Sequence, residues 1–281
     1  MSVSRREMLA SGAVFMAASI SPKGAPMTAG RNRKPGLQLY TIRSEMQKDV
    51  PGSLKRVAQT GYREVEFAGY FGHTPAEIRT MVADLAMTAP SSHVPLDAIR
   101  GKPAQLIADA KEAGHQYLVL AWIPPEERAT VEMWKRHADL LNSFGAQCKG
   151  AGLRLAYHNH DFEFTPVGGQ LPYDILMQNT DPAIVQFELD MYWAKKGGQD
   201  LNALFARHAG RIVMVHVKDM LPNGEMTDVG LGTIPFAQIL AEPAARPVAH
   251  YFVENDDTKT PFESIATSCK ALTQMLAGLP A

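Results

Sequence analysis

The chain has 281 residues, 46% hydrophobic and 20% charged, and its 28 Lys and Arg residues against 29 Asp and Glu residues leave a net charge of −1. This composition excludes a disordered chain, and the balanced charge argues against a nucleic-acid partner. Two cysteines, Cys148 and Cys269, cannot form a disulfide framework, and no apolar run reaches the roughly 18 residues of a membrane span. One α/β barrel of about 250 residues agrees with these limits.

The first thirty residues have the layout of an export signal. The motif Ser-Arg-Arg-Glu-Met-Leu at residues 4–9 precedes a stretch of apolar or small residues at 10–20. The paired arginines resemble the twin-arginine signal, with Met8 where that pattern more often has Phe. Residues 1–30 are therefore predicted to be a leader, with the twin-arginine translocase as partner and the periplasm as destination. The alternative is a basic N-terminus without signal function, which would leave the protein in the cytoplasm.

From Gly36 onward, a strand pattern and a helix pattern alternate eight times. The strand patterns cover residues 37–40, 62–67, 87–93, 117–122, 153–160, 184–190, 212–218 and 251–254. The helical patterns that follow them cover residues 50–59, 75–85, 103–112, 132–149, 173–178, 201–207, 236–240 and 262–276. Eight such units in about 245 residues predict a closed (β/α)8 TIM barrel, a single domain over residues 36–281. A doubly wound sheet would need a glycine-rich turn after its first strand, and the sequence has none there.

Alternation along the strands predicts which side chains face the barrel interior. In the fifth pattern, Leu155 belongs against the helices, so His158 and His160 face inward at the carboxyl end, where catalytic groups of TIM barrels lie. In the seventh pattern, the three valines of residues 213–217 face outward. Glu188, one step deeper than the end of the sixth strand, is interpreted as a structural charge. The other polar side chains predicted to face inward are Glu64, Glu66, Asp190, His216, Lys218, Glu254 and Asp256.

These converging groups predict a metal site. Burying so many ionisable side chains without a partner would cost several kcal/mol each. A divalent cation removes this cost because it accepts imidazole nitrogen and carboxylate oxygen together. The predicted ligands, one from each of strands five to eight, are His158, Asp190, His216 and Glu254. Two imidazoles with two carboxylates suit Mn, Co, Fe or Zn better than Mg, and His160 remains open as a substitute ligand, a ligand's partner or an acid/base group.

Further residues are predicted to bind substrate around this site. Glu66 and His93 are candidates, although Glu66 could equally be a structural ion-pair partner of Arg43 or Lys218. Trp122 and Trp193 follow the fourth and sixth strands, where an aromatic ring could lie under a sugar or simply pack in the core. Lys218 is predicted to hold a substrate hydroxyl or to pair with Asp219.

Four stretches of sequence carry a family resemblance: residues 36–41 (GLQLYT), 157–164 (YHNHDFEF), 188–193 (ELDMYW) and 216–219 (HVKD). They resemble the sugar phosphate isomerase/epimerase family, a branch of the xylose-isomerase-like TIM barrels, over nearly the whole chain after residue 35. The resemblance implies a metal-dependent barrel that acts on sugars, keto-sugars or cyclitols. By position, the family's metal ligands from strands six, seven and eight match Asp190, His216 and Glu254.

The fifth strand departs from the family pattern. Epimerase members of that family use a glutamate there as ligand and proton-transfer base, whereas this sequence has His158. The departure argues against a strict two-carboxylate epimerisation and leaves isomerisation, dehydration or elimination next to a carbonyl open. Glu163, in the loop beyond this strand, could turn into the site.

We therefore expect a metal-dependent isomerase or epimerase that abstracts a proton next to a metal-bound carbonyl of a sugar, keto-sugar or cyclitol. Glu254 or His160 would take the proton, and Lys218 and His93 would hold hydroxyl oxygens. A lyase or dehydratase of keto-sugars, keto-glycosides or inososes is the first alternative, and a non-catalytic periplasmic sugar-binding barrel is the second. Outside the cytoplasm a free sugar is expected rather than a phosphorylated one, and the sequence leaves the oligomeric state open.

Overall fold

The strands form a closed barrel in the order β1-β10-β7-β6-β5-β4-β3-β2, and neighbouring strands are parallel. The computed structural model describes residues 33–280, so the predicted leader at residues 1–30 lies outside the described residues. The barrel strands are β1 (Pro35–Gln38), β2 (Glu64–Phe67), β3 (Thr88–Val94), β4 (Tyr117–Leu120), β5 (Arg154–His158), β6 (Val185–Asp190), β7 (Ile212–Val217) and β10 (His250–Val253). Each overlaps one predicted strand pattern, so the TIM barrel is confirmed.

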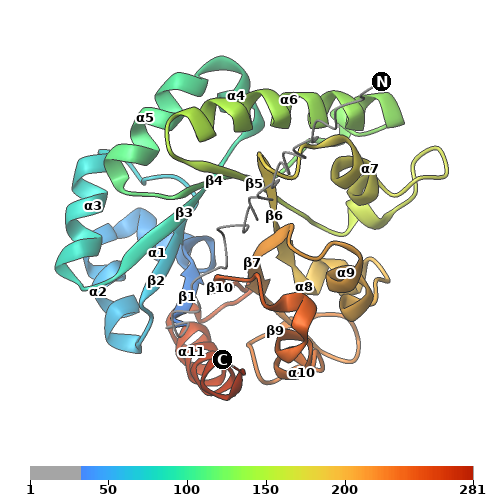
Figure 1. Ribbon diagram of the computed structural model, residues 1–281. Coiled ribbons are helices and arrows are strands. Elements are labelled where there is room, and N and C mark those ends of the chain that lie inside the picture. The colour runs from blue at the N-terminus through green and yellow to red at the C-terminus, as the bar shows by residue number, and fades with distance from the viewer. Residues whose placement is uncertain (1–32, 281) are drawn as a thin grey trace, which may run out of the picture. The chain divides into compact units, whose positions relative to one another are not determined.

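A ring of helices surrounds the strands, and blue β1 meets red β10 where the barrel closes (Figure 1). The helices that the sequence patterns predicted are α2 (Val50–Thr60), α3 (Pro75–Asp84), α5 (Pro103–Ala113), α6 (Val131–Gly150), α7 (Pro172–Asn179), α9 (Leu201–Arg207), α10 (Phe236–Ala241) and α11 (Pro261–Gly278). Local sequence signals define several of their ends. In α3, for example, Thr74 and Glu77 form a reciprocal capping box, and Pro75 occupies the first turn.

Several short elements were not predicted from the sequence. They are α1 (Arg43–Lys48), α4 (Leu96–Gly101), α8 (Met191–Lys196), η1 (Leu39–Ile42), η2 (Pro125–Glu127), η3 (Phe162–Phe164), η4 (Pro243–Ala245) and the antiparallel pair β8 (Asp219–Met220) and β9 (Met226–Thr227). Each has six residues or fewer, too few for a hydrophobic period to be recognised. All except η4 lie in loops that follow the carboxyl end of a barrel strand. They therefore build the same end of the barrel as the predicted site.

Apolar side chains fill the barrel interior beneath the polar residues. Buried Ala156, Met214 and Phe252 belong to an interior cluster, each two positions before an inward-facing polar residue. Val213 was predicted to face outward but belongs to this cluster. The register explains the difference, because Phe187 pairs with residue 212 and the next residue of β6 pairs with residue 214, so that Val213 is skipped in a bulge. Within residues 33–280, no helix is both long enough and apolar enough to cross a bilayer.

Candidate metal centre and active site

The register of the strands brings the predicted ligands together. His158 of β5 pairs with Glu188 of β6, and Asp190, the last residue of β6, pairs with His216 of β7. Glu254 follows β10 directly and completes the row. Because the carboxyl ends of parallel barrel strands share one face, these side chains converge on one buried space. All five are buried.

Two groups of four side chains could hold a cation here, and they share two histidines. The first, which we call the predicted set, consists of His158, Asp190, His216 and Glu254. The second, which we call the Glu188 set, consists of His93, His158, Glu188 and His216. In each set the potential ligand atoms lie within 4.8 Å of one another. The hydrogen bonds of the histidines distinguish the two.

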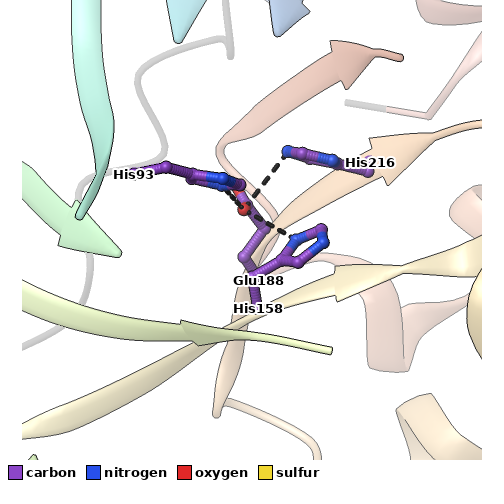
Figure 2. Close-up of side chains that lie close together, drawn as sticks. All are labelled: His93, His158, Glu188 and His216. Carbon is purple, nitrogen blue, oxygen red and sulfur yellow. Dashed lines mark hydrogen bonds and ion pairs between the residues drawn. The ribbon is translucent and has the colours of Figure 1, made fainter. Parts of the chain in front are cut away.

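The carboxylate of Glu188 lies where three imidazole rings meet (Figure 2). Its Oε2 is 2.8 Å from Nε2 of His93, 3.1 Å from Nδ1 of His158 and 3.2 Å from Nε2 of His216. The interpretation of Glu188 as a structural charge missed these contacts. The sequence did contain an indication of these contacts, because Glu188 is an inward-facing residue of the strand that follows the strand of His158. Against the effect of burial, the carboxylates of Glu66 and Glu188 raise the pKa of His93 to about 10.

Each histidine shared by the two sets has one nitrogen bonded to a buried carboxylate that lies outside the predicted set. His158 meets Glu188 through Nδ1, and its Nε2 makes no hydrogen bond within the described residues. His216 meets Glu66 through Nε2 at 2.7 Å, and its Nδ1 lies 2.8 Å from Glu254. Metal-binding imidazoles in proteins usually donate their other N–H to a carboxylate in this way. This pattern leaves Nε2 of His158 and Nδ1 of His216 for a cation and favours the predicted set.

The donors of the predicted set fit a divalent cation. Two imidazoles and two carboxylates are the ligands that Zn, Fe, Mn and Co accept together. Asp190 is fully buried, its Oδ1 accepts a hydrogen bond from the backbone N–H of Trp193 at 2.8 Å, and its Oδ2 has no hydrogen-bond partner. That oxygen lies 3.1 Å from Nζ of Lys218, an ion-pair contact only. A buried carboxylate oxygen with this unused capacity is suited to metal coordination.

The imidazoles of the site differ in charge. Burial lowers the pKa of His216, but the carboxylates of Glu188 and Glu254 outweigh this and hold it well above its usual value. A cation that binds Nδ1 of His216 must therefore displace a proton. His160 behaves in the opposite way, because burial and the neighbouring His158 hold its pKa well below the usual value. His160 is thus a neutral imidazole with a free lone pair at the barrel mouth.

Lys218 is a buried ammonium group among three carboxylates. Its Nζ lies 3.1 Å from Asp190, 2.9 Å from Glu254 and 2.9 Å from Asp256. Burial opposes its charge, but these carboxylates hold its pKa well above the usual value. In this arrangement the ammonium group positions and neutralises acidic side chains. Its predicted role of holding a substrate hydroxyl stays a prediction.

A cavity of about 1040 Å³ opens above the predicted set. The predicted site residues that line it are His93, Trp122, His158, His160, Lys218 and Glu254. Two other predicted substrate-binding residues, Glu66 and Trp193, are not part of this lining. Glu66 is fully buried and bonds to His216, His93 and Gln38, not to Arg43 or Lys218. Trp193 packs 5.4 Å from Nζ of Lys218 and 5.7 Å from the ring of His160.

Glu163 is the middle residue of η3 and does not line the cavity. Its Oε1 accepts a hydrogen bond from Tyr157 at 2.6 Å, and its Oε2 accepts one from the backbone N–H of His160 at 2.8 Å. The side chain is fully buried, and this desolvation raises its pKa from 4.5 to about 8 against the opposing effect of the two hydrogen bonds. Glu163 therefore supports the loop that carries His160 and does not enter the site.

This burial predicts a pH-dependent effect of Glu163→Gln on stability. Between about pH 5 and 8, the folded protein keeps the Glu163 proton that the unfolded chain releases, so wild-type stability falls by up to about 1.4 kcal/mol per pH unit from this group. Glutamine has no proton to lose and can both donate to Tyr157 and accept from the His160 backbone. Urea unfolding at pH 5 to 9 should therefore show the variant gaining stability relative to wild type as pH rises. A pH-independent difference would contradict the assignment.

Comparison with known proteins finds solved structures with the same fold. A sugar phosphate isomerase/epimerase from Parabacteroides distasonis is 27% identical, with a TM-score of 0.76 over 86% of this chain and 98% of the other. An inosose dehydratase from Geobacillus kaustophilus is 26% identical over an alignment of 210 positions that covers 63% of this chain and 67% of that protein. An IolI protein with a bound zinc atom shares the fold at 16% identity and a TM-score of 0.69, covering 88% of this chain and 99% of the other. No family model matches the sequence.

Proposed function

We propose that this protein is a metal-dependent isomerase or epimerase that removes the proton next to the carbonyl of a keto-sugar or keto-cyclitol. The observation that carries the proposal is the predicted set, four buried candidate ligands whose donor atoms lie within 4.8 Å of one another beneath a large cavity. The zinc-binding protein of the same fold and the similarity to a sugar phosphate isomerase/epimerase support it. A divalent cation held by His158, Asp190, His216 and Glu254 would supply Lewis-acid polarisation of the substrate carbonyl.

The residues around the cation site provide for proton transfer. His160 is uncharged near neutral pH and lines the cavity, so its imidazole is available to accept a proton. Burial disfavours the charge of Glu254, but the ammonium of Lys218 and the imidazole of His216 hold its pKa well below the usual value. Glu254 is therefore an ionised carboxylate. His160 follows β5 and Glu254 follows β10, two strands separated in the barrel by β6 and β7, so the two groups approach the cavity from different sides.

A dehydratase is the second candidate, and two observations favour it. Inosose dehydratases from Geobacillus kaustophilus and Bacillus anthracis align with this chain at 26% and 28% identity. In addition, the fifth strand offers the imidazole of His158 in place of a second carboxylate, so the two sides of the site are chemically unlike. Such asymmetry suits an elimination, in which one group takes a proton and another assists the departing hydroxyl.

One experiment separates these reactions. D-Fructose, D-tagatose and an inosose would each be incubated in D₂O with protein loaded in turn with Mn²⁺, Co²⁺, Fe²⁺ or Zn²⁺. Deuterium in recovered substrate or isomer, seen by proton NMR, is the result expected of an isomerase or epimerase. A new enone, seen by ultraviolet absorbance, would identify the dehydratase. Neither signal with any metal would favour the non-catalytic sugar-binding alternative.

We further propose that the reaction takes place in the periplasm after export by the twin-arginine translocase. The support is the Ser-Arg-Arg-Glu-Met-Leu motif at residues 4–9, which lies outside the described residues. Fractionation of cells that express the full chain tests this. Protein confined to the cytoplasm would contradict it.

A further inference from the structure

The cavity above the predicted set is larger than one sugar ring requires. Its volume of about 1040 Å³ is at the upper end of the roughly 300–1,000 Å³ typical of pockets for drug-sized ligands. The cation site accounts for only one part of the lining. The outer part includes Tyr40, Arg43, Leu96, Asp97, Trp122 and Glu126, which come from the loops after β1, β3 and β4.

This outer part carries two exposed aromatic rings. Only three large hydrophobic side chains are exposed among residues 33–280, and two of them, Tyr40 (43%) and Trp122 (46%), line this cavity. The third, Leu231, does not. The guanidinium of Arg43 lies 4.1 Å from the centre of the Tyr40 ring and supports it. Flat aromatic faces in a cavity that also carries hydrogen-bonding groups match the C–H face of a pyranose ring, whose hydroxyls project from its edge.

The cavity lining also carries carboxylates that are unpaired among the described residues, and the guanidinium of Arg128 lies 5.9 Å from the centre of the Trp122 ring. Asp97, Glu126 and Asp257 are exposed, line the cavity and form no ion pair within the described part of the chain. The guanidinium of Arg43 is engaged by the backbone carbonyls of Tyr40 at 2.8 Å and Asp256 at 3.0 Å. Free carboxylates accept hydrogen bonds from hydroxyl groups and repel phosphate. The outer part therefore suits an uncharged polyhydroxylated ligand.

We propose that Tyr40 and Trp122 form a subsite for a second, uncharged sugar ring, joined by a glycosidic bond to the ring that reacts. The substrate class is then a keto-disaccharide rather than a free monosaccharide or a sugar phosphate. The inference rests on the proposed function for the position of the reacting ring at the cation site. The aromatic rings would hold the second ring by stacking, and the free carboxylates would accept its hydroxyl hydrogens.

Calorimetric titration of Mn²⁺-loaded protein tests the subsite without requiring turnover. The probes are glucose, the two disaccharides maltose and cellobiose, and glucose 1-phosphate. At least one disaccharide should bind about tenfold more tightly than glucose, and glucose 1-phosphate should bind no more tightly than glucose. Tyr40→Ala and Trp122→Ala should each weaken disaccharide binding about five- to tenfold and leave glucose binding within about twofold. Leu231→Ala is the matched control and should change neither.

The subsite is overturned if both disaccharides bind no more tightly than glucose, or if the aromatic variants weaken glucose and disaccharide binding equally. Tighter binding of glucose 1-phosphate would overturn its uncharged character. Deuterium exchange with keto-sugars of one ring and of two rings measures the proposed function separately. Selective disaccharide binding without any exchange or enone would therefore contradict the proposed reaction and leave the subsite standing.

Discussion

Purified Asp190→Asn and Glu254→Gln variants should contain almost no divalent metal and should lose activity by about a thousandfold or more. Each change removes a charged oxygen from the predicted set. Without the cation the transition state would lose several kcal/mol of stabilisation, which corresponds to a rate decrease of about this size. Asparagine keeps the oxygen that caps α8 through the Trp193 N–H, so folding should be retained. Metal analysis of the purified protein, with steady-state rates beside it, gives the measurement.

The two possible ligand sets predict opposite outcomes for one histidine. His93 belongs to the Glu188 set alone, so His93→Gln should keep metal at the wild-type ratio. His250→Gln is a matched control, because His250 bonds to Glu64 away from both sets. If His93→Gln lost the metal while Glu254→Gln retained it, the cation would belong to the Glu188 set and our choice would be wrong.

A Glu188→Gln variant should bind the same cation about 10- to 100-fold more weakly while retaining a stoichiometry of one. Glu188 fixes the orientation of His158 by accepting from its Nδ1 at 3.1 Å, and loss of such a partner typically weakens metal binding by this factor. The amide has nearly the same shape and its oxygen can still accept a hydrogen bond, but it lacks the negative charge that strengthens the bond from the imidazole. Competition with a chelator of known affinity would measure the change.

The size of this effect separates a positioning role from direct ligation. Glu64→Gln is the matched control, since Glu64 is also a buried, inward carboxylate and bonds to His250 instead of the site. Complete loss of metal in Glu188→Gln would mean that Glu188 is itself a ligand. Unchanged affinity would mean that the contact with His158 does not orient the ring.

Strand alternation was sufficient to predict which side chains meet at the site. The argument needs only the two-residue repeat of a strand, which gives the inward side, and the position where the strand ends. His158, Asp190 and His216 follow from this argument alone, and the structure brings them together with Glu254. Which ring nitrogen remains available could not be predicted. Glu66 lies 150 residues before His216 in the chain, and only the closed barrel brings the two within 2.7 Å.

The loops after the strands were the less predictable part of the site. Trp122 was assigned to the fourth strand pattern, but β4 ends at Leu120 and the ring is exposed at the rim of the cavity. The α8 helix has six residues and begins beside Asp190, where Trp193 is directed toward Lys218. Such segments are fixed by contacts between distant parts of the chain, and local periodicity carries no information about them.

The position of β10 would link metal binding by the predicted set to completion of folding. Glu254 directly follows β10, which pairs with β7 on one side and with β1 on the other. β10 is therefore the strand that closes the barrel. Before β10 pairs, only three residues of the predicted set are in place, and Glu254 is missing. A cation would therefore find the complete predicted set only after β10 has paired with both β1 and β7.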